Sequence, residues 1–224
     1  MTDAPIATTP GAAQQLQVDP TKLDAVLIVG AGLGGLTAAV ALQKAAYRVQ
    51  IFEKAPDLRK SPRGIVIQSN AMKALRNIDL EEPVRAAGVT LQRAIFSSWK
   101  GNTLLEIPLA EMARELSAPV VSLPRAKLCA ILLSNLKVGV VHLSSNCVRF
   151  ELGPPGVKLF LDNGQEVEGS ALVGADGLHS RIRAQLLGEI EPIYAGFTSW
   201  SGVTLAGDFG DISVAHEMWG PGAR

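Results

Sequence analysis

Three glycines near the start of the chain stand at a spacing that can bind the phosphates of a dinucleotide. Gly30, Gly32 and Gly35 satisfy the pattern G-x-G-x-x-G within the segment GAGLGG. In this pattern the first glycine allows a tight turn, the second lets the backbone approach a pyrophosphate, and the third lets a helix pack closely on a strand. The start of that helix offers free N–H groups and the positive end of its dipole to the phosphates. Because the chain contains 22 glycines, the spacing alone is a weak signal, and the flanking elements must support it.

The flanking elements give that support. Residues 24–29 form an apolar, β-branched run that is typical of a central parallel strand buried on both faces. An Ala-rich stretch over 36–47 predicts the helix, and residues 48–52 predict a second strand that ends at Glu53. Glu53 can accept hydrogen bonds from both hydroxyls of a ribose and would repel a 2′-phosphate, which favours FAD or NAD over NADP. The alternative is a glycine-rich turn followed by a surface glutamate.

A second junction between a strand and a loop lies at 170–183. An apolar run ends in Asp176-Gly177, and a helix with basic residues in its first turns follows. Asp176 can either contact a cofactor or cap that helix with its carboxylate. Asp176, His179 and Ser180 also suggest a hydrolytic trio. They are close neighbours at one helix start, however, and the sequence has no G-x-S-x-G elbow, so the spacing argues against a triad.

The composition excludes several classes of protein. Lys plus Arg and Asp plus Glu both total 21, so the chain lacks the basic excess that a nucleic-acid binder needs to neutralise phosphates. A hydrophobic share of 47% excludes a mostly disordered chain. Cys129 and Cys147 stand far apart, which excludes a disulfide scaffold and makes the cytoplasm the expected location. The three histidines have no metal-ligand spacing, so we expect no metal site.

Two segments near the N-terminus need separate attention. Residues 1–22 are rich in Ala, Pro, Thr and Gln and lack the basic start and apolar block of a secretory signal, so we expect a disordered tail. A plastid location is the alternative. Residues 25–42 are uncharged and long enough to suggest a membrane span. Four glycines within six positions would break such a helix near its start, so we expect no transmembrane segment.

Taken in order, five features resemble a known family: GAGLGG, Glu53, RGIVIQSNAMKAL at 63–75, Pro124-Arg125, and ALVGADGLHSRIR at 171–183. The chain resembles the single-component, FAD-dependent monooxygenases of the p-hydroxybenzoate hydroxylase type. Within that family, IQSNAMKALRNIDL is similar to zeaxanthin epoxidases, and YAGFTSWSGV at 194–203 is similar to the FAD-dependent urate hydroxylase branch. The resemblance covers about residues 24–220.

The resemblance implies an α/β fold, with a three-layer Rossmann-like FAD-binding domain and part of a β-sheet substrate domain. It implies bound FAD, NAD(P)H as co-substrate, O₂, and an apolar or aromatic small-molecule substrate. No catalytic nucleophile or base is singled out, because the cofactor carries the chemistry in such enzymes. The cofactor contacts that it implies are Gly30, Ala31, Gly32, Leu33, Gly34, Gly35, Glu53, Lys54, Arg63, Gly64, Arg125, Val148, Asp176 and Gly177.

The same resemblance gives a domain organisation. After the tail, residues 23–90 and 119–190 would form the FAD-binding domain, 91–118 a hairpin of the substrate domain, and 191–224 the incomplete start of the substrate-domain sheet. A downstream Gly-Asp motif of the family is missing, so we expect a C-terminally truncated chain with weak or no turnover. The alternatives are a catalytically inactive FAD-binding fragment or interaction protein, and an NAD-dependent dehydrogenase. The dehydrogenase requires a second glycine fingerprint or a catalytic His–acid pair, and the sequence has neither.

Overall fold

The computed structural model describes residues 25–58, 63–154, 156–198, 202 and 210–222 of the chain. The expectations for the tail at 1–22, for Asp24 as the first strand residue, and for parts of the segment at 194–203 lie outside these described residues.

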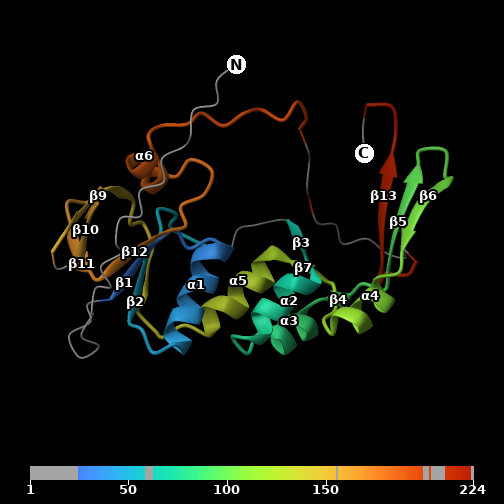
Figure 1. Cartoon of the computed structure of the whole chain (residues 1–224), viewed down its shortest axis with the longest axis horizontal. Coiled ribbons are helices and arrows are strands. Elements are labelled where there is room, and N and C mark those ends of the chain that lie inside the picture. Colours follow the sequence, from blue (N-terminus) through green and yellow to red (C-terminus); the bar gives the residue numbers. More distant parts are fainter. Residues whose placement is uncertain (1–24, 59–62, 155, 199–201, 203–209, 223–224) are drawn as a thin grey trace, which may run out of the picture.

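A four-stranded parallel sheet forms the centre of the larger part of the molecule (Figure 1). Its strands, in spatial order, are β12 (Ala171–Gly174), β1 (Val26–Val29), β2 (Val49–Phe52) and β8 (Val141–His142). Every neighbouring pair runs parallel. All four residues of β1 are buried, which confirms the central strand that its apolar sequence predicts.

Two different layers cover the faces of this sheet (Figure 1). On one face, alternate side chains such as Ile28 and Ile51 pack with residues of the helices α1 (Leu33–Lys44) and α5 (Arg125–Ser134). On the other face, Leu27 and its neighbours pack against an antiparallel sheet and α6 (Arg181–Leu187). The antiparallel sheet has the order β11-β10-β9, with β9 at Cys147–Gly153, β10 at Gly156–Leu161 and β11 at Glu166–Gly169. This arrangement confirms the three-layer α/β fold.

The helical layer continues into a second small antiparallel sheet with the order β3-β7-β4. Its members and their adjoining helices are β3 (Gly64–Ile67), α2 (Ser69–Arg76), α3 (Glu81–Ala87), β4 (Val89–Thr90) and β7 (Val121–Pro124). Met72, Leu80 and Val84 are almost fully buried and belong to the same core as α1 and α5. Gly64, opposite Pro124 in the β3–β7 ladder, therefore sits at the start of α5.

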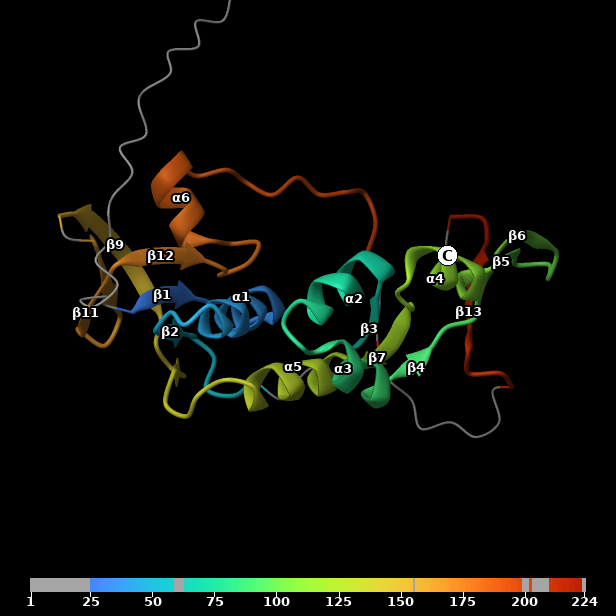
Figure 2. The same ribbon diagram turned by 60° about the horizontal axis from the view of Figure 1, so that its bottom comes forward.

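A third antiparallel pair lies at the far end of the molecule from β9–β11 (Figures 1 and 2). Its strands β5 (Arg93–Ser98) and β6 (Thr103–Ile107) form the hairpin that the sequence predicts, and α4 (Leu109–Leu116) follows. The strand β13 (Val214–Trp219) adds to β5 in parallel. Phe96 and Trp219 meet edge-on across this pair with ring centroids 6.1 Å apart. Residues more than 100 positions apart are thus brought into one sheet.

Two expected elements differ from the structure. The mostly apolar residues 138–143 predict a strand over the whole segment, but β8 contains only Val141 and His142. Gly139 has a φ of +83°, a left-handed turn that interrupts extended backbone before the strand can form. The first helix begins at Leu33 and not at 36, because the N–H of Leu36 already bonds the carbonyl of Gly32 at 3.0 Å.

Candidate cofactor site

A pocket of about 420 Å³ lies where the parallel strands β12, β1 and β2 end. The carboxyl ends of parallel strands are where open α/β sheets bind their ligands. Both sequence junctions meet here, because residues that follow each of these strands line the pocket. The lining residues are Val29, Gly30, Gly32, Phe52, Glu53, Lys54, Ser145, Asn146, Cys147, Ala175, Asp176, Gly177, His179 and Arg181.

The glycines of the loop after β1 differ in what surrounds them. Gly30 has a φ of +102°, and a Cβ there would lie 2.3 Å from the carbonyl oxygen of Ala175. A Cβ on Gly35 would lie 1.9 Å from the carbonyl oxygen of Gly30. The fold therefore requires glycine at both positions. A Cβ on Gly32 or Gly34 would meet nothing within 4 Å, so these two positions face open space.

The open space beside Gly32 suits a phosphate. Gly32 is the N-cap of α1, with no side-chain cap and no acidic residue in the first turn. Leu36 is the first residue whose N–H bonds back within the helix, so the preceding N–H groups are left for another partner. A bound pyrophosphate can accept hydrogen bonds from those groups, and a side chain at Gly32 would fill the space that it needs.

Glu53, directly after β2, is held by the backbone around it. Its Oε2 accepts a hydrogen bond from the N–H of Ala31 at 2.8 Å, and its Oε1 accepts one from the N–H of Ala55 at 2.9 Å. The backbone N–H of Glu53 donates to His142 at 2.9 Å, and the N–H of Ser145 donates to the Glu53 carbonyl at 2.8 Å. Each carboxylate oxygen has a second lone pair, so the half-buried side chain can still accept bonds from ribose hydroxyls.

Asp176, after β12, caps α6. Its Oδ2 accepts from the N–H groups of Arg181 at 2.7 Å and Ile182 at 3.3 Å, and its Oδ1 accepts from the Ser180 hydroxyl at 2.6 Å. The hydroxyl oxygen of Ser180 in turn accepts from the N–H of Arg183 at 2.9 Å. The capping interpretation of Asp176 is therefore correct. It does not exclude a cofactor contact, because Asp176 also lines the pocket.

A buried thiol forms part of the pocket wall. Burial raises the pKa of the Cys147 thiol, and the nearby charge of Asp176 raises it further. The Sγ donates a hydrogen bond to the carbonyl of Arg149 at 3.5 Å. Cys147 is thus a neutral, poorly reactive group beside the space that a cofactor would occupy.

Four of the residues that the resemblance implies lie elsewhere. Arg63, Gly64 and Arg125 lie together, and the N–H of Arg125 donates to the carbonyl of Arg63 at 2.9 Å. They do not line the pocket, and neither does Val148, which borders a neighbouring hollow with Arg149. Ala31, Leu33, Gly34 and Gly35 belong to the loop and helix start beside the pocket without lining it.

The sequence pattern does not predict one part of the pocket wall. Ser145 and Asn146 come from the connection between β8 and β9, and Cys147 is the first residue of β9. They reach the pocket because β8 pairs with β2, which places the end of both strands at the same edge. The local signal for these residues is that polar side chains directly follow an apolar run. The pairing of β8 with β2, which brings them to the pocket, joins segments that are distant in the chain.

Two features are absent from the described residues. None of their helices has the length and apolar character needed to cross a membrane. Among the same residues, no cluster of three or more His, Cys, Asp or Glu side chains is arranged to hold a metal ion.

Comparison with known proteins identifies the class of this fold and site. Residues 24–204 match a protein family described as an FAD binding domain, so most of the chain belongs to that family. Relatives that match the same region include proteins named as a monooxygenase/isomerase, a 3-hydroxybenzoate 6-hydroxylase and a zeaxanthin epoxidase. The proposed resemblance is confirmed.

Particular relatives are similar over the same region. The chain is 39% identical over 199 residues to an aurachin C monooxygenase/isomerase from Stigmatella aurantiaca, covering 89% of this chain and 52% of the relative. It is 36% identical over 194 residues to a chloroplastic zeaxanthin epoxidase from Spinacia oleracea, covering 82% and 29%. A crystal structure of Klebsiella pneumoniae HpxO with FAD and uric acid superposes with a TM-score of 0.68 at 25% identity, covering 73% and 42%. The chain thus spans about half or less of the length of these proteins.

Proposed function

We propose that this chain forms the FAD-binding part of an NAD(P)H- and O₂-dependent monooxygenase that hydroxylates or epoxidises an apolar or aromatic small molecule. The observation that carries the proposal is the convergence of Gly32, Glu53 and Asp176 on one pocket at the carboxyl ends of β1, β2 and β12. When bound there, FAD would supply the chemistry by taking electrons from NAD(P)H and activating O₂.

The residues of the chain bind and orient the cofactor. The free N–H groups at the start of α1 would hold the pyrophosphate, with Gly32 leaving room for it. Glu53 would accept the ribose hydroxyls through lone pairs that its two backbone bonds leave free. Because a second negative charge next to Glu53 would be repelled, the site favours the unphosphorylated ribose of FAD.

Three of the remaining implied contacts would serve the flavin end of the cofactor. Arg63, Gly64 and Arg125 lie together at the start of α5, outside the pocket that would hold the nucleotide end. We assign 23–90 and 119–190 to cofactor binding, and 91–118 with 191–224 to the substrate side. The pairing of β13 with β5 supports this division, because it joins the two substrate-side segments in one sheet.

The relatives support the choice of substrate class. The relatives include a zeaxanthin epoxidase and a 3-hydroxybenzoate 6-hydroxylase, and the HpxO crystal structure contains FAD and uric acid. An apolar or aromatic small molecule is therefore the class of substrate that this chain, within its whole protein, would oxidise.

The test begins with cofactor uptake by the purified chain. We expect added FAD to stay with the protein through desalting and to give a flavin absorption spectrum. NADH or NADPH added without oxygen should bleach that spectrum, and the faster of the two identifies the co-substrate. Failure to take up FAD would contradict the cofactor assignment, whereas uptake without bleaching would contradict the co-substrate assignment.

A pair of glycine variants makes the test specific to the loop. Gly32→Val places a side chain where the pyrophosphate must lie and should weaken FAD binding at least tenfold. Gly153→Val is the matched control, since Gly153 lies at the end of β9 and a Cβ there also meets nothing within 4 Å. Equal loss of FAD binding in both variants would contradict the assignment of the loop.

A further inference from the structure

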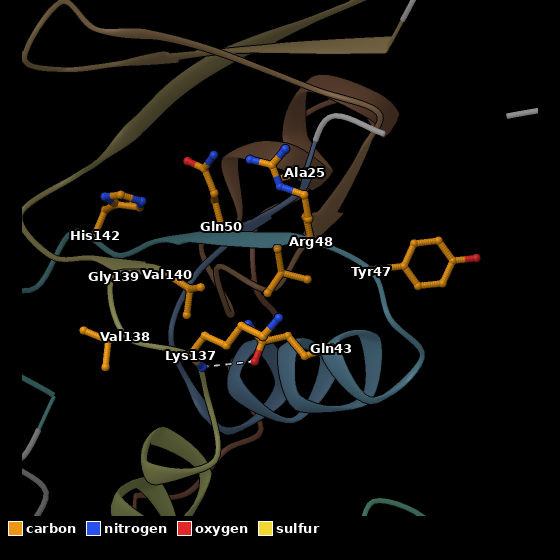
Figure 3. A pocket seen from close by; sticks show the side chains of 11 residues that line it. Ala25, Gln43, Tyr47, Arg48, Gln50, Lys137, Val138, Gly139, Val140 and His142 are labelled. Atoms are coloured by element: carbon orange, nitrogen blue, oxygen red, sulfur yellow. Dashed lines mark hydrogen bonds between the residues drawn. The ribbon is translucent and has the colours of Figure 1, made fainter. Parts of the chain in front are cut away.

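A second hollow, of about 510 Å³, lies beside the amino end of β2 (Figure 3). It shares no lining residue with the cofactor pocket. Its lining residues are Ala25, Gln43, Tyr47, Arg48, Val49, Gln50, Lys137, Val138, Gly139, Val140 and His142. The family assignment gives this hollow no role.

The hollow forms where the pairing of β2 with β8 stops. The N–H of Ile51 donates to Val140 at 2.8 Å, and the N–H of Glu53 donates to His142 at 2.9 Å. Alternate residues of a strand point their backbone groups to the same edge, so the N–H of Val49 points there too. No partner among the described residues continues the ladder to Val49, because the turn at Gly139 leaves Val138 fully exposed. The N–H of Val49 is therefore a free donor facing the hollow.

Among the described residues that line the hollow, the charged side chains are all positive. Arg48 and Lys137 both line the hollow, and neither forms an ion pair within the described part of the chain. No carboxylate belongs to the described part of this lining. Figure 3 shows Arg48 on one side of the strand and Lys137 on the other, beside Gln43. The backbone N–H of Lys137 donates to Oε1 of Gln43 at 3.2 Å, which fixes the segment that carries the lysine.

His142, which also lines the hollow, has a ring nitrogen without a hydrogen-bond partner. Its ring stacks on Phe52, with centroids 5.0 Å apart and planes 12° from parallel, which fixes its orientation. Its Nε2 is buried and has no hydrogen-bond partner. A buried polar group without a partner costs about 1–3 kcal/mol, so a ligand that supplies an acceptor for an Nε2–H would gain binding energy.

We propose that this hollow binds a small organic anion through a carboxylate or phosphate group. The oxyanion would accept a hydrogen bond from the N–H of Val49 and would lie between the positive charges of Arg48 and Lys137. A further oxygen of the ligand would accept from His142. The volume of the hollow leaves room for a hydrocarbon body beside Val138 and Val140, which also line it.

The test uses sodium phosphate and sodium benzoate as two separate probes, titrated into the ¹⁵N-labelled full chain at constant ionic strength set with sodium chloride. We expect saturable shifts of the Val49 and Gln50 amide signals with at least one probe. Saturation by phosphate alone or by benzoate alone supports the site and identifies which oxyanion it prefers. Absence of a saturable shift with both probes would overturn the proposal.

Charge variants separate a specific site from general attraction. The double variant Arg48→Gln/Lys137→Gln should weaken binding at least tenfold. Arg114→Gln/Lys73→Gln removes the same two charge types from exposed positions on α4 and α2 and should leave the affinity unchanged. His142→Phe keeps an aromatic ring against Phe52 and should also weaken binding. Equal affinity in the wild type and the Arg48/Lys137 variant, with unchanged thermal midpoints, would overturn the proposal.

Discussion

The backbone N–H of Ala31 donates to Oε2 of Glu53 at 2.8 Å, which joins the glycine loop after β1 to the acid after β2. The two residues are 22 positions apart, and the parallel pairing of β1 with β2 brings them together. Glu53 therefore stabilises the loop even without a ligand. It fixes the loop whose open side would receive the phosphates.

Glu53→Gln should weaken both the loop and cofactor binding. A glutamine side chain has a single acceptor oxygen, so it cannot offer a separate oxygen to each of Ala31 and Ala55, and its NH₂ group would face one of those N–H donors. Hydrogen bonds to a charged group are worth about 1.5–3 kcal/mol, so we expect the Kd for FAD to rise about 10- to 150-fold. The measurement is a titration of FAD followed by its fluorescence.

The matched control is Glu111→Gln, because Glu111 is an exposed acid in the first turn of α4. It should leave the Kd for FAD unchanged. An unchanged Kd in Glu53→Gln would show that the acid serves the loop alone and not the ribose.

Gly35→Ala and Gly34→Ala should have opposite effects although the two glycines are adjacent. A Cβ at Gly35 would lie 1.9 Å from the carbonyl oxygen of Gly30, so the helix must move away from the strand. Overpacking of this kind costs about 1–3 kcal/mol. A Cβ at Gly34 meets nothing, and alanine is favoured over glycine in a helix by about 1 kcal/mol. Urea unfolding followed by circular dichroism measures both, and equal stability of the two variants would contradict the close contact.

The local parts of this fold are readable from the sequence because their signals are local. The run at β1 is apolar and β-branched, and it proves to be buried along its whole length. The hairpin β5–β6 has a turn at Gly101, whose φ of +85° glycine adopts without strain. The spacing of Gly30, Gly32 and Gly35 likewise marks three positions of the loop. A Cβ at Gly30 or Gly35 would meet backbone, whereas Gly32 faces open space.

The parts that escape the sequence depend on pairing between distant segments. The addition of β13 to β5 joins residues far apart in the chain, and no residue pattern announces it. The shortening of β8 follows from one glycine, Gly139, whose turn conformation the apolar residues around it conceal. The place of Asn146 and Cys147 in the pocket wall also depends on distant pairing, because it is set by the strand that β8 joins.

Asp176→Ala and Ser180→Ala should separate capping from cofactor binding. Both residues satisfy N–H groups at the start of α6, and loss of such a cap costs about 0.5–2 kcal/mol of stability. We expect both variants to unfold at lower urea concentration. Only Asp176→Ala should also raise the Kd for FAD, because Asp176 lines the pocket and Ser180 does not. Equal changes in the Kd would mean that Asp176 acts through the helix alone.

Cys147 should react slowly with iodoacetamide, and FAD should protect it further. Its pKa is raised by burial and by the charge of Asp176, so the reactive thiolate is scarcer at neutral pH than in an exposed cysteine. Alkylation should therefore accelerate as the pH rises through the alkaline range.

Cys129 is the internal control, since it is buried in α5 away from the pocket, and burial raises its pKa too. Peptide mass spectrometry measures both rates in one sample. Because Cys147 lines the pocket and Cys129 does not, FAD should lower the rate at Cys147 by a larger factor, and an equal decrease at both would indicate general tightening of the fold and not occupation of the pocket.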